Sequence, residues 1–347
     1  MSIRFTSKRQ NRGELCVMSC NSGKPLAIRI LKYLNEILQK EERDIELNLV
    51  DSDEVNFANG EIKTVINENI RGADLYIIQC IDDPNSQNSI NDNLMALITA
   101  INAAYQSDAD SITVVVPQYP YSRQERKKTR EGITAKQVSS FLEISGADRV
   151  ITLDIHAEAI QGFFNDAKLE DLHASNTLLE FIEKNISTNN LVVAAADVGG
   201  ADKARFYSKK LHADLAIVDK ARDYSKSSVV ESMRLVGNVK GKDVLIPDDM
   251  ISTAGTMVNA AKLLKQYGAD DIYIACSLPF FNHPAIERLS ESFKNGEIKL
   301  VLGTDAVFWG QDFINHNPWY REVTIAPLFA QVMYNINTKQ SVSTLLR

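Results

Sequence analysis

One stretch, residues 244–256, constrains the fold more than any other part of the chain. It reads Val-Leu-Ile-Pro-Asp-Asp-Met-Ile-Ser-Thr-Ala-Gly-Thr, and apolar residues then recur at helical spacing until Gly268. The pattern predicts a short buried strand, a turn of small residues and a helix. Such a turn directs backbone N–H groups at an anion, and the helix dipole adds to the attraction. The stretch therefore predicts an anion-binding loop in an α/β fold.

Two carboxylates, Asp248 and Asp249, lie directly before this turn. Acidic side chains repel a phosphate, so we expect them to bind sugar hydroxyls or a divalent cation instead. Thr253 and Thr256 add hydroxyl donors, and Gly255 lets the backbone approach a ligand closely because it has no side chain. The alternative is an ordinary strand-to-helix turn with two solvated acids. The stretch alone leaves both interpretations open.

Composition excludes several classes of protein. At 347 residues the chain is long enough for two domains. Its 44% apolar and 24% charged residues are typical of a soluble globular protein, and it has no run of the roughly 20 apolar residues that a membrane helix needs. The first ten residues lack the apolar core of a signal peptide. A net charge of −7 argues against nucleic-acid binding, and four cysteines without a CxxC pair fit a reducing compartment. We expect a cytoplasmic protein with no nucleic-acid or membrane partner.

Strand-like and helix-like segments alternate along the chain. The predicted strands cover residues 14–19, 45–50, 74–79, 112–116, 149–155, 191–196, 215–218, 244–246 and 272–276. The predicted helices cover residues 26–34, 92–105, 136–144, 178–186, a segment that ends near 211, and 257–264. This alternation predicts parallel sheets with helices on both faces. The tripeptide Gly-Ala-Asp stands between a helix and a strand at 146–148 and again at 268–270, which weakly favours a duplicated α/β domain.

Two further stretches are candidates for binding a nucleotide, because open α/β sheets bind ligands at the carboxyl ends of their strands. Residues 57–61 place an aromatic ring, an amide and a carboxylate close together, which can stack on and hydrogen-bond a purine. Arg123 and Gln124 begin a dense basic run after the strand that ends at Val116. In an acidic chain such a run can neutralise a polyphosphate. The alternatives are a plain surface loop and a solvated charged face.

Two more stretches are candidates for metal binding and catalysis. His156 and Asp197 each follow a predicted strand, and the two can share one Mg²⁺, which takes few protein ligands. A lone His is more often structural. Lys220 and Arg222 open a polar, Ser-rich stretch, residues 220–231, which we expect to be a mobile loop. Such a loop can close over a reacting diphosphoryl group.

Together these stretches resemble, in the same order, those of the ribose-phosphate diphosphokinases, or phosphoribosyl diphosphate (PRPP) synthetases. The resemblance runs from about Leu15 to Leu346, whereas type I phosphoribosyltransferases share the stretch at 244–256 but not the segments at 57–61 and 123–124. It implies an α/β fold of two tandem type I phosphoribosyltransferase-like domains, each a mostly parallel sheet flanked by helices. The N-terminal domain, 14–160, would carry the ATP-binding loops. The C-terminal domain, 161–347, would carry the ribose 5-phosphate loop and the catalytic flexible loop.

The resemblance also implies a reaction and a set of roles. The chain would transfer the diphosphoryl group of Mg-ATP to the 1-hydroxyl of ribose 5-phosphate, giving PRPP and AMP for nucleotide, His and Trp biosynthesis. Its partners would be ATP, ribose 5-phosphate and Mg²⁺, and it would form a homo-oligomer, a hexamer built from dimers. The implied residues are Lys220 and Arg222 for catalysis; Phe57, Asn59, Gly60, Glu61, Arg123 and Gln124 for ATP; Asp248, Asp249, Ser252, Thr253, Ala254, Gly255 and Thr256 for ribose 5-phosphate; and His156 and Asp197 for the metal.

Two departures from the family pattern leave a second hypothesis open: Pro247 precedes the acid pair, and Ser252 stands where the family usually carries Asp. The alternative is a non-catalytic regulatory paralogue of a PRPP synthetase. The presence of Lys220, Arg222, His156 and Asp197 argues against it. The basic run after Gln124 is also one residue shorter than usual, which leaves the residue match across 127–131 open.

Overall fold

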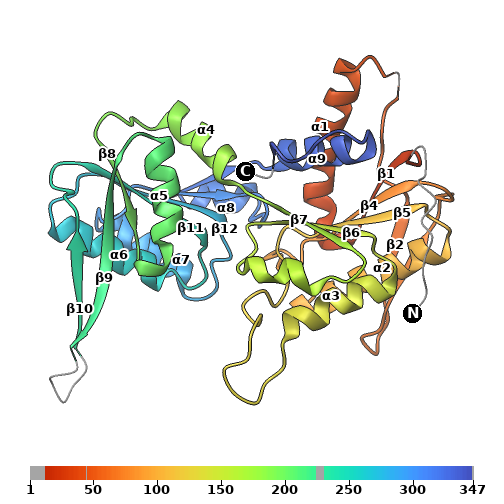
Figure 1. Ribbon diagram of the computed structural model, residues 1–347, viewed down its shortest axis with the longest axis horizontal. Coiled ribbons are helices and arrows are strands. Elements are labelled where there is room, and N and C mark those ends of the chain that lie inside the picture. Colours follow the sequence, from red (N-terminus) through yellow and green to blue (C-terminus); the bar gives the residue numbers. More distant parts are fainter. Residues whose placement is uncertain (1–11, 44, 224–229, 346–347) are drawn as a thin grey trace. The chain divides into compact units, whose positions relative to one another are not determined.

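The computed structural model describes residues 12–43, 45–223 and 230–345, and the chain divides into two compact units (Figure 1). The first unit spans Met1–His173 and Ala326–Arg347, and the second spans Ala174–Ile325. The predicted domain ranges, 14–160 and 161–347, differ from these units and stay a prediction. The difference lies mainly in the last helix, which the structure groups with the N-terminal part of the chain.

The first unit is built on a five-stranded sheet whose neighbouring strands all run parallel. In spatial order the strands are β1 (Leu15–Ser19), β4 (Asp74–Ile78), β5 (Ser111–Val115), β6 (Arg149–Leu153) and β7 (Lys168–Leu172). All five residues of β4 are buried, as expected of a central strand covered on both faces. The parallel order confirms the predicted fold class for this unit.

Helices cover both faces of this sheet. They are α1 (Lys24–Lys40), α2 (Ile90–Gln106), α3 (Thr134–Ser145) and α9 (Ala326–Asn337), with short 3₁₀ helices at Asn21–Gly23 and Glu158–Phe163. Helix α1 packs against α9 and α2 packs against α3, on opposite sides of the strands (Figure 1). Ser89 and Asp92 form a capping box at the start of α2, and Gly146, with φ of 120°, ends α3. The hydroxyl of Tyr76 donates to the Met333 carbonyl at 3.2 Å, which fixes α9 to β4.

The strand predicted at 45–50 is wrong. Only Leu49 makes an isolated parallel bridge there, to Val17 of β1. The cause is Asn35 on α1, whose side chain binds the peptide groups of Leu47: Nδ2 donates to the carbonyl at 3.0 Å and Oδ1 accepts from the N–H at 2.8 Å. Because a side chain satisfies this backbone, the segment does not need a neighbouring strand.

Three strands of this unit were not predicted. Strands β2 (Ser52–Asn56) and β3 (Ile62–Ile66) form a separate antiparallel hairpin, and β7 forms the edge of the parallel sheet. The hairpin lies against α2, where the Thr64 and Thr99 hydroxyls are 3.1 Å apart. Its strands carry many polar residues and bury little, so they lack the apolar alternation that identifies a strand in sequence.

The second unit contains a seven-stranded sheet that is parallel except at one edge. In spatial order its strands are β10 (Val230–Val236), β9 (Asp214–Asp223), β8 (Leu191–Ala195), β11 (Asp243–Met250), β12 (Ile272–Leu278), β13 (Leu300–Thr304) and β14 (Tyr320–Val323). Only the pairing of β9 with β10 is antiparallel. The central position of β11 places its carboxyl end in the middle of one edge of the sheet.

The helices of this unit are α4 (Ser175–Asn185), α5 (Ala201–Lys210), α6 (Gly255–Gln266), α7 (Ala285–Lys294) and α8 (Gln311–His316), with a 3₁₀ turn at Val198–Gly200. Buried residues of α6 and α7 share one core with Val244 and Ile246 of β11. Phe281 lies at the centre of an aromatic group in this core, formed with Trp309, Phe313, Trp319 and Tyr320. This core fixes the two helices that flank the loop after β11.

The expected loop at 220–231 also differs from the structure. Strand β9 continues to Asp223 and β10 begins at Val230, so half of the stretch is strand; the other half, residues 224–229, lies outside the described part of the chain. None of the described helices combines the length and apolar character needed to cross a membrane.

Candidate active site

The acid pair lies at the end of β11. Both Asp248 and Asp249 are half-buried, and Oδ1 of Asp248 accepts the backbone N–H of Asp249 at 2.8 Å. Burial, together with the hydrogen bond and negative charge of the Asp249 side chain, raises the pKa of Asp248 to about 8, against the opposing charge of Lys203 on α5. A carboxyl that keeps its proton at neutral pH stands beside a carboxylate. Such a pair can both donate to and accept from two neighbouring hydroxyls.

The loop after the acid pair is held firmly at its start. The N–H of Ile251 donates to the Leu278 carbonyl at 3.0 Å, and its carbonyl accepts the N–H of Phe281 at 3.0 Å. Ile251 is therefore tied by both backbone groups to the segment that follows β12. The buried position of its side chain adds to this anchoring.

Helix α6 begins in an unusual way. Its N-cap is Ala254, which has a left-handed backbone with φ of 59° and no side chain able to cap the helix. Left-handed geometry costs a residue other than glycine roughly 1–2 kcal/mol. The first N–H groups of a helix have no partner within it, and Ser, Thr, Asp or Asn would normally satisfy one of them. A strained and uncapped helix start is suited to an anion that supplies the missing acceptors.

Two side chains that the sequence did not single out brace this loop. The Ser252 hydroxyl donates to Oδ1 of Asn282 at 2.9 Å, and Nη1 of Arg288 on α7 donates to the Thr253 carbonyl at 2.9 Å. No sequence signal marks Asn282 or Arg288, because both are remote from the loop in sequence and neither stands in a recognisable motif. The Ser252 contact also gives the serine, where the family usually has Asp, a role in holding the loop.

Asp197 caps the turn after β8. Its Oδ1 accepts the N–H of Gly200 at 3.1 Å, so the carboxylate is fixed at the carboxyl end of a strand next to β11. A Cβ on Gly199 would lie 3.2 Å from that oxygen, which favours glycine there. Asp197 is half-buried and is therefore accessible to a ligand.

In the first unit, two acids fix the backbone that precedes His156. After β6 ends, Asp154 adopts a left-handed backbone with φ of 42°, and its Oδ1 lies 3.0 Å from Nδ1 of His173. Asp171 accepts the N–H of Ile155 at 3.0 Å. Backbone and side-chain contacts thus fix the residues directly before His156, whose own side chain is exposed.

Residues 57–61 form the turn of the β2–β3 hairpin. The N–H of Phe57 donates to the Glu61 carbonyl at 2.8 Å, and Gly60 takes the left-handed φ of 90° that the turn requires. Oδ1 of Asn59 accepts the N–H of Glu61 at 3.1 Å. The expectation that this stretch ends a strand of the parallel sheet is wrong, because the hairpin forms its own sheet. The Phe57 ring is 48% exposed and available to a planar ligand.

The basic run after β5 is compact. The N–H of Gln124 donates to the Tyr121 carbonyl at 2.9 Å, and its own carbonyl accepts the N–H of Ala135 at the start of α3. Glu131 accepts the N–H groups of Lys128 and Thr129. The side chains of Arg123 and Gln124 are exposed at the carboxyl end of β5.

The two predicted catalytic residues lie in a strand. In β9 the backbones of Lys220 and Arg222 stand opposite Met233 and Glu231 of β10. Their side chains lie outside the described part of the structure. The roles predicted for them stay a prediction.

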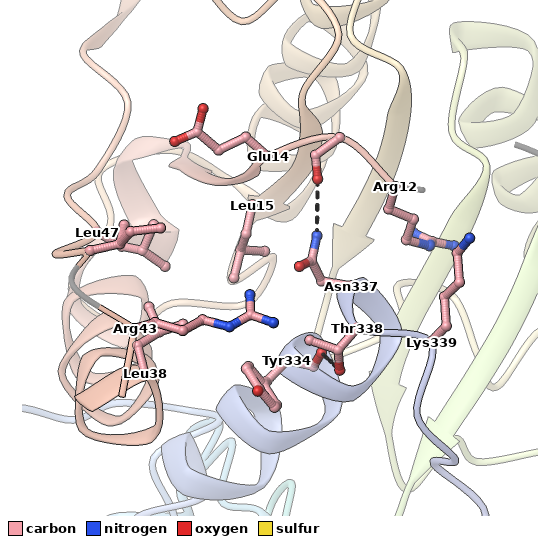
Figure 2. A pocket seen from close by; sticks show the side chains of 12 residues that line it. Arg12, Glu14, Leu15, Leu38, Arg43, Leu47, Tyr334, Asn337, Thr338 and Lys339 are labelled. Carbon is pink, nitrogen blue, oxygen red and sulfur yellow. Dashed lines mark hydrogen bonds between the residues drawn. The ribbon is translucent and has the colours of Figure 1, made fainter. Parts of the chain in front are cut away.

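A cavity in the first unit contains none of the predicted site residues (Figure 2). Its volume is about 450 Å³, and it lies between the start of β1 and the C-terminal end of α9. Arg43 lies over the Tyr334 ring at 5.6 Å, and Nδ2 of Asn337 donates to the Gly13 carbonyl at 3.2 Å. Arg12 pairs with buried Asp74 at 2.8 Å. These contacts join α9 to the sheet.

Two mostly parallel sheets, with an acid pair and an uncapped helix start at the carboxyl end of a central strand, define the class of phosphoribosyltransferase-like proteins. Two family models match the chain: the N-terminal domain of ribose phosphate pyrophosphokinase over residues 15–146, and the phosphoribosyl transferase domain over residues 167–308.

Individual relatives narrow this class. A ribose-phosphate pyrophosphokinase of Chlorobaculum tepidum is 43% identical over 298 residues, 86% of this chain and 87% of the relative. One of Listeria ivanovii is 37% identical over 336 residues, 96% of this chain and 97% of the relative. The crystal structure of phosphoribosylpyrophosphate synthetase from Mycobacterium smegmatis matches with a TM-score of 0.81 and 30% identity, over 94% of this chain and 99% of that one.

The chain therefore belongs to the ribose-phosphate pyrophosphokinase, or PRPP synthetase, family. It is an enzyme with that activity, a transferase of the kinase type in nucleotide biosynthesis. The predicted family, fold class and function are confirmed. The alternative of a non-catalytic paralogue is not needed to explain any of these similarities.

Proposed function

We propose that the second unit binds ribose 5-phosphate and the first binds ATP, and that the chain transfers the diphosphoryl group of ATP to the 1-hydroxyl of the sugar, giving PRPP and AMP. The observation that carries the proposal is the start of α6, where a left-handed, uncapped helix N-terminus follows a pair of acids that share one proton. An anionic end and a diol end of one substrate match these two features.

In this proposal the loop binds the 5-phosphate through its backbone N–H groups and two hydroxyls. Thr253 and Thr256 supply the hydroxyls, Gly255 permits the close approach, and Ser252 and Ala254 set the shape of the loop. The carboxyl groups before the loop, Asp248 and Asp249, bind the ribose 2- and 3-hydroxyls. Positioning of this kind removes much of the entropic barrier to reaction.

ATP binding is proposed for the exposed groups of the first unit. The Phe57 ring stacks on adenine, and Asn59, Gly60 and Glu61 supply hydrogen bonds at the hairpin turn. Arg123 and Gln124 bind the phosphates, where a guanidinium matches the geometry of phosphate oxygens. In the family the hairpin is expected to serve a neighbouring subunit, which is consistent with our proposal of a homo-oligomer, a hexamer built from dimers.

The residues present fit Mg²⁺ brought in with ATP. Among the described residues no group of three or more His, Cys, Asp or Glu is arranged to hold a metal by itself. Mg²⁺ needs only one or two protein ligands when substrate phosphates and water complete its octahedron. Asp197 offers a fixed carboxylate and His156 an exposed imidazole, for direct or water-mediated contact. The ion, when bound, neutralises phosphate charge and orients the diphosphoryl group.

The chemistry proposed for the chain is positioning and electrostatic stabilisation. Lys220 and Arg222 stabilise the negative charge that develops on the transferred group, and the acid pair holds the sugar so that its 1-hydroxyl can attack. Phosphoryl transfer needs little covalent participation from the protein.

A turnover assay with paired variants tests the proposal. AMP release from ATP should depend on ribose 5-phosphate and yield PRPP in equal amount. Asp249→Ala should raise KM for ribose 5-phosphate, whereas Asp312→Ala, on the exposed first turn of α8, should leave it unchanged. An Asp249→Ala variant with wild-type KM for the sugar would refute the assignment of this site, and sedimentation of the intact enzyme would test the oligomer.

A further inference from the structure

We propose that Arg288 is a positioning residue for the loop at residues 252–256, orienting a backbone N–H and placing a positive charge beside the bound phosphate. The proposal rests on the assignment of this loop to the 5-phosphate of the sugar. It concerns a residue on α7, which is remote in sequence from every stretch discussed so far.

The packing of α7 holds Arg288 beside the loop. Ala285 and Leu289 on α7 are buried in the core that α7 shares with α6, and they fix the helix that carries the arginine. Nη1 of Arg288 lies 2.9 Å from the Thr253 carbonyl. A Cβ built on Gly255 would lie 3.3 Å from the same nitrogen and 4.0 Å from Cζ. The guanidinium therefore contacts the loop at Thr253 and lies over the space where a side chain at position 255 would stand.

This contact controls the direction of one N–H group. In a trans peptide the carbonyl and the following N–H point in opposite directions within one plane. By binding the Thr253 carbonyl, the guanidinium therefore fixes the direction of the Ala254 N–H, which belongs to the same peptide. The left-handed φ of 59° at Ala254 makes this peptide the strained part of the loop.

The arginine has donors left after this bond. A guanidinium has five N–H donors in a planar fork and keeps its charge throughout the pH range of an enzyme assay. One Nη1 contact to Thr253 occupies part of the fork, and the side chain is otherwise exposed. The remaining donors and the charge are available to a dianionic phosphate at the start of α6.

The Ser252–Asn282 bond supports the loop from the same side. Asn282 lies in the turn between β12 and α7, so one segment braces the loop at Ser252 and again, through Arg288, at Thr253. A purely structural brace predicts a lower apparent kcat through loss of folded enzyme, with KM for both substrates unchanged. A positioning role predicts an effect confined to the phosphorylated substrate.

Steady-state kinetics of the full-length enzyme separate these cases. Arg288→Ala should raise KM for ribose 5-phosphate about 10- to 100-fold, with kcat lowered less than about threefold and KM for ATP unchanged. Arg288→Gln keeps an amide donor for the carbonyl but no charge, and Arg288→Lys keeps the charge on a single ammonium. Both variants should have a KM for ribose 5-phosphate between those of wild type and Arg288→Ala. Arg321→Ala, on exposed β14, is the matched control and should behave as wild type.

Four outcomes decide between these cases. A KM for ribose 5-phosphate within twofold of wild type in Arg288→Ala would overturn the proposal. So would a parallel loss of kcat and Tm that Arg288→Lys fails to rescue. Thr256→Val tests the loop assignment separately: if it raises KM for the sugar while Arg288→Ala does not, the loop binds phosphate without help from Arg288. If neither variant changes that KM, the loop assignment itself is wrong.

Discussion

Asp248 accepts a hydrogen bond from the backbone N–H of Asp249 at 2.8 Å, so two adjacent acids occupy one half-buried site at the end of β11. Burial, together with the hydrogen bond and charge of the neighbouring Asp249 side chain, raises the pKa of Asp248 to about 8. Because this folded-state pKa is above the ordinary value, the stabilising contribution of Asp248 is complete below about pH 4 and is lost as the pH rises through about 8.

The acid pair should therefore make sugar binding pH-dependent. Protonated Asp248 can donate to one ribose hydroxyl while Asp249 accepts from the other, so kcat/KM for ribose 5-phosphate should fall as the pH rises, with a midpoint near the pKa of about 8. Asp249→Asn removes the neighbouring charge and should move this midpoint to lower pH, together with a lower overall rate. Asp312→Asn should not move it. A midpoint that stays in place in Asp249→Asn would show that the two acids are not coupled.

Asp171 should reduce the stability of the enzyme at neutral pH. Burial raises its pKa to about 6, so its stabilising contribution is complete below about pH 4 and lost as the pH rises through about 6. Asp171→Asn cannot ionise and can still accept the Ile155 N–H. A shift of about two pKa units corresponds to at most about 3 kcal/mol. We expect Tm to be a few degrees higher than wild type at pH 8 and equal at pH 4, with exposed Asp166→Asn as the control.

Phe57→Ala should weaken ATP binding without affecting the fold. The ring is 48% exposed, so its removal leaves the core intact. Stacking of a base on an aromatic ring contributes about 1–3 kcal/mol, which predicts a KM for ATP raised roughly 5- to 100-fold. Tm should change by less than about a degree. Ile144→Ala removes a side chain that is 84% exposed on α3 and should leave both quantities unchanged. An unaltered KM for ATP in Phe57→Ala would show that the hairpin turn is a surface loop that does not bind ATP.

Lys220→Ala should lower kcat far more than it raises either KM, because a charge that stabilises the transferred group matters most in the transition state. Loss of one such contact typically costs about 3–4 kcal/mol, or roughly 10²–10³ in rate. Lys209→Ala, on the exposed face of α5, is the comparison. If Lys220→Ala keeps half of the wild-type kcat, Lys220 does not stabilise the transition state.

His156→Ala should shift the Mg²⁺ dependence of the rate to higher concentration, since one direct or water-mediated ligand is lost. The exposed side chain contributes little to stability, so Tm should be unchanged. His316→Ala, at the end of α8, provides the control. If the Mg²⁺ titration of His156→Ala superimposes on that of wild type, the histidine has no part in holding the ion.

The central strands and the phosphate loop were predictable because local signals agree there. The run Val244–Ile246 is apolar, two acids follow it after Pro247, and small residues precede a helical repeat. All of these local signals indicate the same structure, a strand followed by a turn and a helix. The segment 45–50 failed because Asn35, a residue on another element, satisfies the backbone of Leu47. A period of two in the sequence does not reveal such a competing partner.

The contacts that shape the site could not be predicted for a similar reason. Asn282 and Arg288 reach the loop only because α7 packs beside α6, and nothing in their own neighbourhoods marks them. The pKa of Asp248 depends on the depth of β11 in the sheet and on Lys203 from α5. Sequence thus indicated candidate chemical groups for the site. Their bracing and protonation depend on packing between elements that are distant in sequence.

Helix α9 has a consequence for how the protein forms during synthesis. It packs on α1, and its Asn337 donates to buried Asp74 at 3.0 Å, so the first unit is complete only when residues that follow the whole second unit are present. A ribosome makes a chain from its N-terminus and domains usually fold in that order. Here the second unit has all of its sequence once residue 325 has left the ribosome, whereas the first unit must wait for α9. The part of the chain that is made first is therefore the last to close.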